Sequence, residues 1–68
     1  MKQIKLTIDE KFTKLNELFG KGKYKLTNLR PFGMGLSAPF TQDIVNLEGR
    51  IIGLYSHNPI EVDEITIF

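Results

Sequence analysis

Apolar and polar residues alternate along several short stretches of the chain, and this alternation predicts half-buried β-strands. In the first stretch Ile4, Leu6 and Ile8 share one face, and in the second Tyr24 and Leu26 do so. The predicted strands are residues 2–8, 23–29, 43–47, 50–55 and 61–68. The last of them places Ile65 and Ile67 on a common face, with Thr66 and Phe68 on the other.

The segment between the first two predicted strands has helical spacing instead. Its apolar residues recur every three or four positions, whereas Lys11, Lys14 and Glu17 fall outside that stripe. The apolar stripe consists of Phe12, Leu15, Leu18 and Phe19. We expect a helix of about three turns that packs this stripe against the sheet.

The ends of the predicted helix carry recognisable signals. Thr7 and Glu10 have the spacing of a capping box, and Asp9 is an alternative N-cap. Gly20 is suited to end the helix because glycine adopts the left-handed conformation common at C-termini. Lys21 and Lys23 follow it, where positive charge complements the negative end of the helix dipole.

Turn signals separate the later strands. Residues 46–49 predict a turn in which Gly49 takes a positive φ, and residues 56–59 predict another. Gly53 lies inside a predicted strand, which indicates a β-bulge or a close backbone approach. The order is strand, helix, strand, long loop and three antiparallel strands. We therefore predict one small α+β domain over residues 1–68, with a curved sheet or partial barrel and one helix packed on it.

Composition excludes several kinds of site. The 68 residues include no cysteine and one histidine, so disulfides, thiolate metal sites and His-rich metal sites are excluded, and we expect no cofactor. No apolar run approaches the roughly 20 residues of a membrane span. The first residues are charged and alternating, unlike a signal peptide. The sequence thus favours a cytoplasmic protein with no membrane partner.

The residues that could serve in catalysis lack a suitable arrangement. His57 falls in a predicted turn, where we expect it to be solvated, and no nucleophile motif accompanies it. Asp63 and Glu64 are neighbours in a strand and so point to opposite faces. Glu61 and Asp63 share a face, where strand carboxylates commonly keep an edge soluble. We therefore expect no enzyme.

Charge is divided unevenly along the chain. Residues 1–30 carry eight Lys and Arg against three Asp and Glu, and residues 31–68 carry one against five. This division fits a basic binding face, or two halves that attract each other in the folded protein.

The densest cluster of positive charge follows the predicted helix. Residues 20–23 read Gly-Lys-Gly-Lys, but they leave a helix C-terminus, whereas a phosphate-binding loop leads into a helix N-terminus. What remains is a basic patch of Lys21, Lys23 and Lys25. Lysines neutralise phosphates and aromatic rings stack on bases. Tyr24 is a stacking candidate, although its position on the Leu26 face also fits the core.

The stretch from Arg30 to Phe40, RPFGMGLSAPF, has neither helical nor strand periodicity and is unusually apolar for a loop. Its prolines stiffen both ends and its glycines allow tight backbone turns. Two interpretations stay open. The side chains of Phe32, Met34 and Phe40 plug the core, or they form an exposed site for a protein partner.

The same stretch resembles a known motif. Leu29 and the run Pro31–Gly35, with Pro39 four residues on, resemble the PFGxGNxxP signature of the bacterial RecJ-type single-strand exonucleases of the DHH phosphoesterase family. In that family the segment lies beside the oligonucleotide-binding domain, after the catalytic core. A strand pair usually follows it, similar in placement to residues 50–55 and 65–68 here.

The chain departs from that family in important ways. Leu36 and Ser37 stand where the family has Asn and Pro, and there is no Asp-His-His motif. Asp and His are too few to hold the family's metal ions. The resemblance therefore implies a detached module associated with nucleic acid and does not imply exonuclease activity.

Two functions follow as hypotheses. The first is a small non-enzymatic module that binds single-stranded nucleic acid, with phosphate contacts from Lys21, Lys23, Lys25 and Arg30 and stacking by Tyr24 or Phe32. The second is a protein-interaction module, such as a small phage-type or accessory protein that inhibits or adapts a larger enzyme, using Phe32, Met34 and Phe40. A homodimer through the edge of the C-terminal strand is a further expectation of the second.

Overall fold

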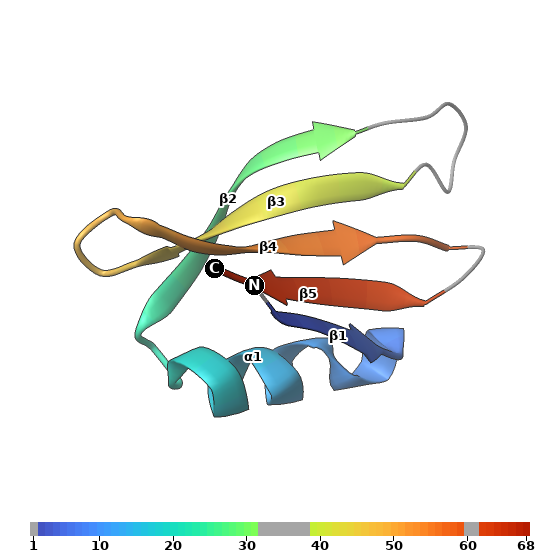
Figure 1. Ribbon diagram of the computed structural model, residues 1–68, viewed down its shortest axis with the longest axis horizontal. Coiled ribbons are helices and arrows are strands. Elements are labelled where there is room, and N and C mark those ends of the chain that lie inside the picture. The colour runs from blue at the N-terminus through green and yellow to red at the C-terminus, as the bar shows by residue number, and fades with distance from the viewer. Residues whose placement is uncertain (1, 32–38, 60–61) are drawn as a thin grey trace.

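The protein forms a five-stranded antiparallel sheet with one α-helix, which confirms the predicted α+β class (Figure 1). The computed structural model describes residues 2–31, 39–59 and 62–68. The strands are β1 (Lys2–Leu6), β2 (Tyr24–Pro31), β3 (Phe40–Asn46), β4 (Ile51–His57) and β5 (Asp63–Ile67). A 3₁₀ turn, η1 (Ile8–Glu10), leads into the helix α1 (Lys11–Phe19).

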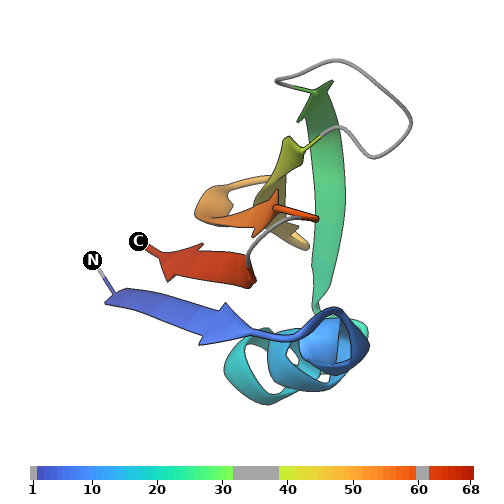
Figure 2. The same ribbon diagram turned by 90° about the vertical axis from the view of Figure 1, so that its right-hand side faces the viewer.

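The sheet is curved and does not close into a barrel. Its strand order is β1-β5-β4-β3-β2, and every neighbouring pair is antiparallel. The helix therefore connects the two edge strands, and it lies at the base of the curled sheet between them (Figure 2). Since β5 lies between β1 and β4, the expectation of a dimer through the C-terminal strand edge is wrong: the available edges belong to β1 and β2.

The core lies between the concave face of the sheet and α1. The buried apolar side chains come from β1, β3, β4, β5 and α1. They are Leu6, Leu15, Ile44, Tyr55 and Ile65. Within each strand they alternate with residues on the opposite, convex face, as the period of two requires. We call that opposite face the outer face.

The first predicted strand is shorter than its alternation indicated. β1 ends at Leu6 and residues 8–10 form a 3₁₀ turn, so the prediction of a strand to Ile8 is wrong. The cause is one half of the predicted capping box, although α1 itself begins after Glu10 without a side-chain cap. The side chain of Glu10 accepts hydrogen bonds from the backbone N–H of Thr7 at 3.4 Å and from its hydroxyl at 2.8 Å. These local bonds turn the chain before it can extend further.

In its first turn, the helix packs a different side chain against the sheet from the one that the apolar stripe predicts. Leu15 is fully buried, but Phe12 is 60% exposed, and Lys11 takes its place toward the sheet. The Nζ atom of Lys11 lies 4.2 Å from the centre of the Tyr55 ring. Residues 11 and 15 are four apart and so share a helix face. The assignment of Phe12 to the core stripe and of Lys11 to the polar side is therefore wrong.

Three strands extend into regions that were predicted as loop. β2 continues to Pro31, β3 begins at Phe40, and β4 continues through His57. The residues between Pro31 and Pro39 lie outside those described. The turn at residues 46–49 is confirmed, with Gly49 at φ +85° and its N–H donating to the carbonyl of Asn46.

Gly53 fulfils both expectations for a glycine inside a strand. The register between β3 and β4 shifts beside it, between the pairs Ile44–Gly53 and Val45–Ile51. A Cβ at Gly53 would lie 2.5 Å from the carbonyl oxygen of Thr66. The neighbouring strand thus approaches too closely for any side chain at this position.

Candidate functional site

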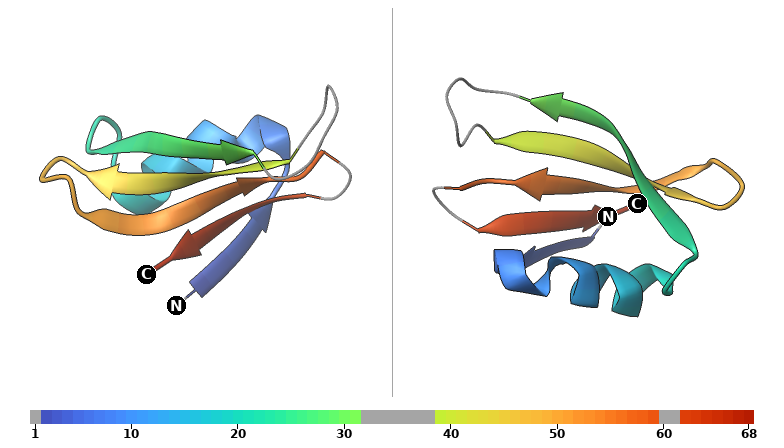
Figure 3. Two further views of the ribbon diagram at one scale, coloured as in Figure 1. Left: turned by 90° about the horizontal axis from the view of Figure 1, so that it is seen from above. Right: turned by 180° about the vertical axis from the view of Figure 1, so that it is seen from behind.

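The antiparallel topology gathers five cations at one end of the sheet. β1, β2 and β4 begin at this end, and β3 and β5 finish there. Figure 1 and the left view of Figure 3 show both termini, the α1–β2 connection and the β3–β4 turn toward this end. We call it the basic end. Its cations are Lys2, Lys21, Lys23, Lys25 and Arg50.

Backbone pairing fixes how these residues are brought together. Lys2 pairs with Ile67, and the N–H of Phe68 donates to the carbonyl of Ile52 in the next strand. Arg50 lies in the adjoining β3–β4 turn. Asn46, the last residue of β3, pairs with Tyr24. Lys23 and Lys25 flank Tyr24. Residues distant in the sequence therefore form one continuous border.

The cations of the basic end are exposed, and their charges are not used inside the protein. None of the five has a side-chain hydrogen bond or ion pair with the described residues. The side-chain carboxylates of the described residues at the same end are Glu17 and Glu48, and Glu17 is already paired with Lys14 at 3.4 Å. An excess of uncompensated positive charge thus faces solvent here.

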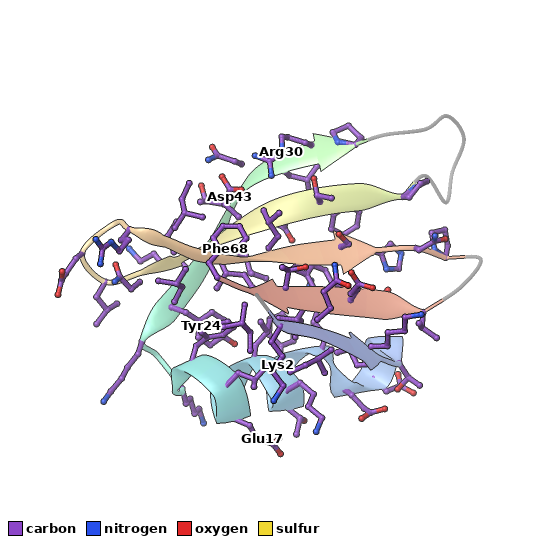
Figure 4. All side chains as sticks on the ribbon, viewed as in Figure 1. Lys2, Glu17, Tyr24, Arg30, Asp43 and Phe68 are labelled. Carbon is purple, nitrogen blue, oxygen red and sulfur yellow. The ribbon has the colours of Figure 1, made fainter. Side chains whose placement is uncertain are left out.

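Tyr24 is partly buried and packs against the core, so it does not project from the surface of the basic patch. Its hydroxyl donates to Oδ1 of Asn16 on α1 at 2.9 Å, and its ring lies 6.2 Å from that of Phe19. Burial raises the pKa of its hydroxyl. Figure 4 shows Tyr24 above the C-terminal part of α1. The ring is fixed between helix and sheet, so a base would have to displace it in order to stack there.

Arg30 is separated from the lysines and is bound to a buried carboxylate on the outer face, that of Asp43. Its Nη2 donates to Oδ1 of Asp43 at 2.8 Å, and Asn28 donates to the other oxygen at 2.7 Å. The two residues that hold Asp43 come from a β-bulge in β2, where Asn28 has φ +54°. Figure 4 shows Arg30 and Asp43 side by side. The bonds from Arg30 and then Asn28 lower the pKa of Asp43.

This ion pair bears on the charge division seen in the sequence. Arg30 belongs to the basic first half and Asp43 to the acidic second half, so attraction between the halves is realised at this contact. Among the described residues it is the only ion pair that joins them. The lysines of the basic end remain unpaired, so the alternative of a basic face still applies to them.

The apolar candidates of the Arg30–Phe40 stretch are only partly described. Phe40 is half-buried, with its ring 5.0 Å from His57 and 6.1 Å from Tyr55, which fits a core residue. Phe32 and Met34 lie outside the described residues. The resemblance to the RecJ-type motif depends mainly on that same segment and stays a prediction.

An exposed aromatic residue at the basic end was not singled out from the sequence. Phe68 is 57% exposed and projects from the outer face, because its neighbour Ile67 packs on the core. Lys2 and Arg50 were missed as well. No spacing along the chain signals them, since only the pairing of β5 with both β1 and β4 brings the two ends of the sequence together.

A buried polar cluster at the opposite end of the sheet was also missed. Asp63 is 2% exposed and accepts hydrogen bonds from the hydroxyl of Tyr55 and the backbone N–H of Asn58. Nδ1 of His57 lies 2.8 Å from the same carboxylate. The expectations of a solvated His57 and of a surface-facing Asp63 are therefore wrong. The β4–β5 hairpin places both side chains inside the concave face.

Lys11 completes this cluster from the helix. Desolvation lowers the pKa of its amine, while the charge of Asp63 opposes that shift. Burial, and then the bond to Asp63, raises the pKa of the Tyr55 hydroxyl. Every buried side-chain polar atom in the described part of the chain has a hydrogen-bond partner. The cluster satisfies itself, which fits a polar network that holds α1 and the hairpin together.

Two features, a metal-binding cluster and a membrane-spanning helix, are absent from the described residues. Within residues 2–31, 39–59 and 62–68, no group of three or more His, Asp or Glu side chains is arranged to bind a metal ion. Over the same ranges, no helix is long and apolar enough to cross a membrane.

Comparison with known proteins gave no relative. No protein-family model, no curated protein and no solved structure matched the chain.

Proposed function

We propose that this protein is a small non-enzymatic module that binds nucleic acid through the basic end. The observation that supports the proposal is the gathering of five exposed cations whose charges have no partner in the described structure. Phosphate contacts from lysine and arginine supply most of the affinity in binding of this kind. The chain has no cysteine, which fits a reducing compartment such as the cytoplasm.

Lys23 and Lys25 are central to the proposed interface. They flank Tyr24, so they point to the side away from the core, and both are exposed. Arg30 is not included, because Asp43 already neutralises its guanidinium. A nucleic-acid backbone would contact the α1–β2 connection and continue along the border toward Arg50 and Lys2.

A matched pair of single variants tests this assignment. Lys25→Gln removes one charge at the basic end, and Lys5→Gln removes one elsewhere. Lys25→Gln should weaken binding of a labelled oligothymidylate roughly threefold or more at about 50 mM salt, and lower the salt slope by about 0.7. Fluorescence anisotropy measures both quantities.

The Lys5→Gln control should change affinity much less, since Lys5 lies outside the proposed interface. Equal losses from the two variants would mean that only net charge matters and would contradict a localised site. Absence of binding by the unaltered protein at low salt would overturn the proposal and favour the protein-interaction hypothesis.

A further inference from the structure

Phe68 differs from the other aromatic side chains in the described residues. Phe19 and Tyr24 pack on each other, and Phe40 packs on Tyr55. Phe12 contacts the amine of Lys11. Phe68 has no ring or cation contact within the described part of the chain and is more than half exposed. Its ring is therefore free to contact another molecule.

The surroundings of Phe68 combine apolar surface with positive charge. Ile51 is 46% exposed and follows Arg50. It shares the outer face with Val45, its cross-strand partner. Phe68 pairs with the neighbouring Ile52 through its backbone. Lys2 pairs with Ile67, which packs on the core, so Lys2 lies on the other face of the sheet. An exposed ring thus lies among apolar residues of the outer face, next to the strand that Arg50 precedes.

We infer that Phe68 is the base-stacking residue of the basic end and makes the site selective for single-stranded nucleic acid. The inference rests on the proposed function and replaces Tyr24 as the stacking residue. In single strands the faces of the bases are accessible to aromatic side chains, and stacking is tolerant of sequence. Duplex bases are already stacked, so they would gain only the phosphate contacts.

The spacing suits a short single strand. Phe68, which directly follows β5, and Lys25 in β2 share the outer face and are separated by β4 and β3. Three strand spacings amount to about 14 Å along the curved sheet. A stretch of about four nucleotides, the lower end of site sizes on small sheet domains, covers this path. Arg50 and Lys25 would contact phosphates along this path.

The test compares two probes of equal length, oligothymidylate and an abasic oligonucleotide that keeps the sugar-phosphate backbone. Phe68→Ala should weaken binding of oligothymidylate about fivefold or more, the effect of losing one stacked base. It should leave binding of the abasic probe unchanged. Phe12→Ala, which removes the exposed ring of α1, is the matched control and should affect neither probe.

A second variant keeps an aromatic ring and reports on stacking directly. The chain has no tryptophan, so Phe68→Trp introduces a single fluorophore. Its emission should be quenched by oligothymidylate and not by the abasic probe, whereas Phe12→Trp should not be quenched by either.

The outcomes separate this inference from the proposed function. If the unaltered protein binds and Phe68→Ala binds equally well, stacking by Phe68 is overturned while the basic end stands. If Phe68→Ala loses affinity for both probes equally, its role is structural and the inference also fails. If the unaltered protein binds neither probe, the proposed function fails as well.

Discussion

Asp43 shows how one buried carboxylate can engage a cation, Arg30, that the sequence presents as free to bind a ligand. A carboxylate on the outer face of a sheet would ordinarily be solvated, yet Asp43 is 5% exposed. The bulge in β2 allows Asn28 and Arg30 to bond to its two oxygens. The sequence presents Arg30 as one more cation of a basic half, and only the bulge reveals that it is engaged.

The pair predicts a specific response to acid. The pKa of Asp43 is lowered in the folded state, chiefly by Arg30, so the unfolded chain binds the proton more readily. The stabilisation is fully present above the ordinary aspartate pKa of about 4 and is lost as pH falls through the lower, folded value. Arg30→Gln should raise the pKa of Asp43 toward its ordinary value, as followed by NMR titration of the carboxyl carbon.

Asn28→Ala provides the comparison at the same site. It removes the second contribution to the pKa and should raise it less than Arg30→Gln does. A pKa of Asp43 that does not change in Arg30→Gln would show that the ion pair is absent in solution.

At the scale of elements, α1 depends on one buried residue more than on its whole apolar stripe. Leu15 is fully buried at the centre of the core, whereas Phe12 projects from the first turn. Leu15→Ala should therefore lower the free energy of unfolding by about 2–5 kcal/mol. Phe12→Ala should change it by about 0.5 kcal/mol or less. Urea denaturation of the two variants measures both.

A loss of stability in Phe12→Ala as large as that in Leu15→Ala would mean that the helix is rotated from the position described here. The comparison is sharp because both residues belong to the apolar stripe expected from the sequence. The structure separates them by the helix face that Lys11 and Leu15 share.

The sequence predicted the elements well where interactions between residues close together in the chain determine them. The sequence located all five strands, Gly20 ends α1 as expected, and the turn before Arg50 has the predicted Gly49. Prediction failed where contacts between residues distant in the sequence determine the position of a side chain. Lys11 faces the core because Tyr55 and Asp63 lie across from it. His57 is drawn inward by Asp63, which no spacing along the chain indicates.

At the scale of the whole molecule, strand order determines the candidate site. The sequence identified Lys21, Lys23 and Lys25 because they are close together in the chain. It could not identify Lys2, Arg50 and Phe68, since these join the same border only through the pairing of β1, β5 and β4. The molecule thus separates a solvent-facing basic end from an opposite end whose polar groups are bound to one another.

This separation explains how a protein of nearly neutral net charge could bind an anion. The formal net charge is +1, but Asp43 and Asp63 are buried and bonded inside the fold. Their charges are therefore less available to the surface than those of the lysines. Local potential rather than net charge governs the encounter with a charged ligand at short range.

The central claim is tested most directly by the salt dependence of binding. A labelled single-stranded oligonucleotide is titrated with the unaltered protein, and fluorescence anisotropy is recorded at about 50 and 200 mM salt. Three or more phosphate contacts predict that affinity falls roughly tenfold or more between these conditions. Binding that is equally strong at both, or no binding at the lower salt, would contradict the assignment of the basic end to nucleic acid.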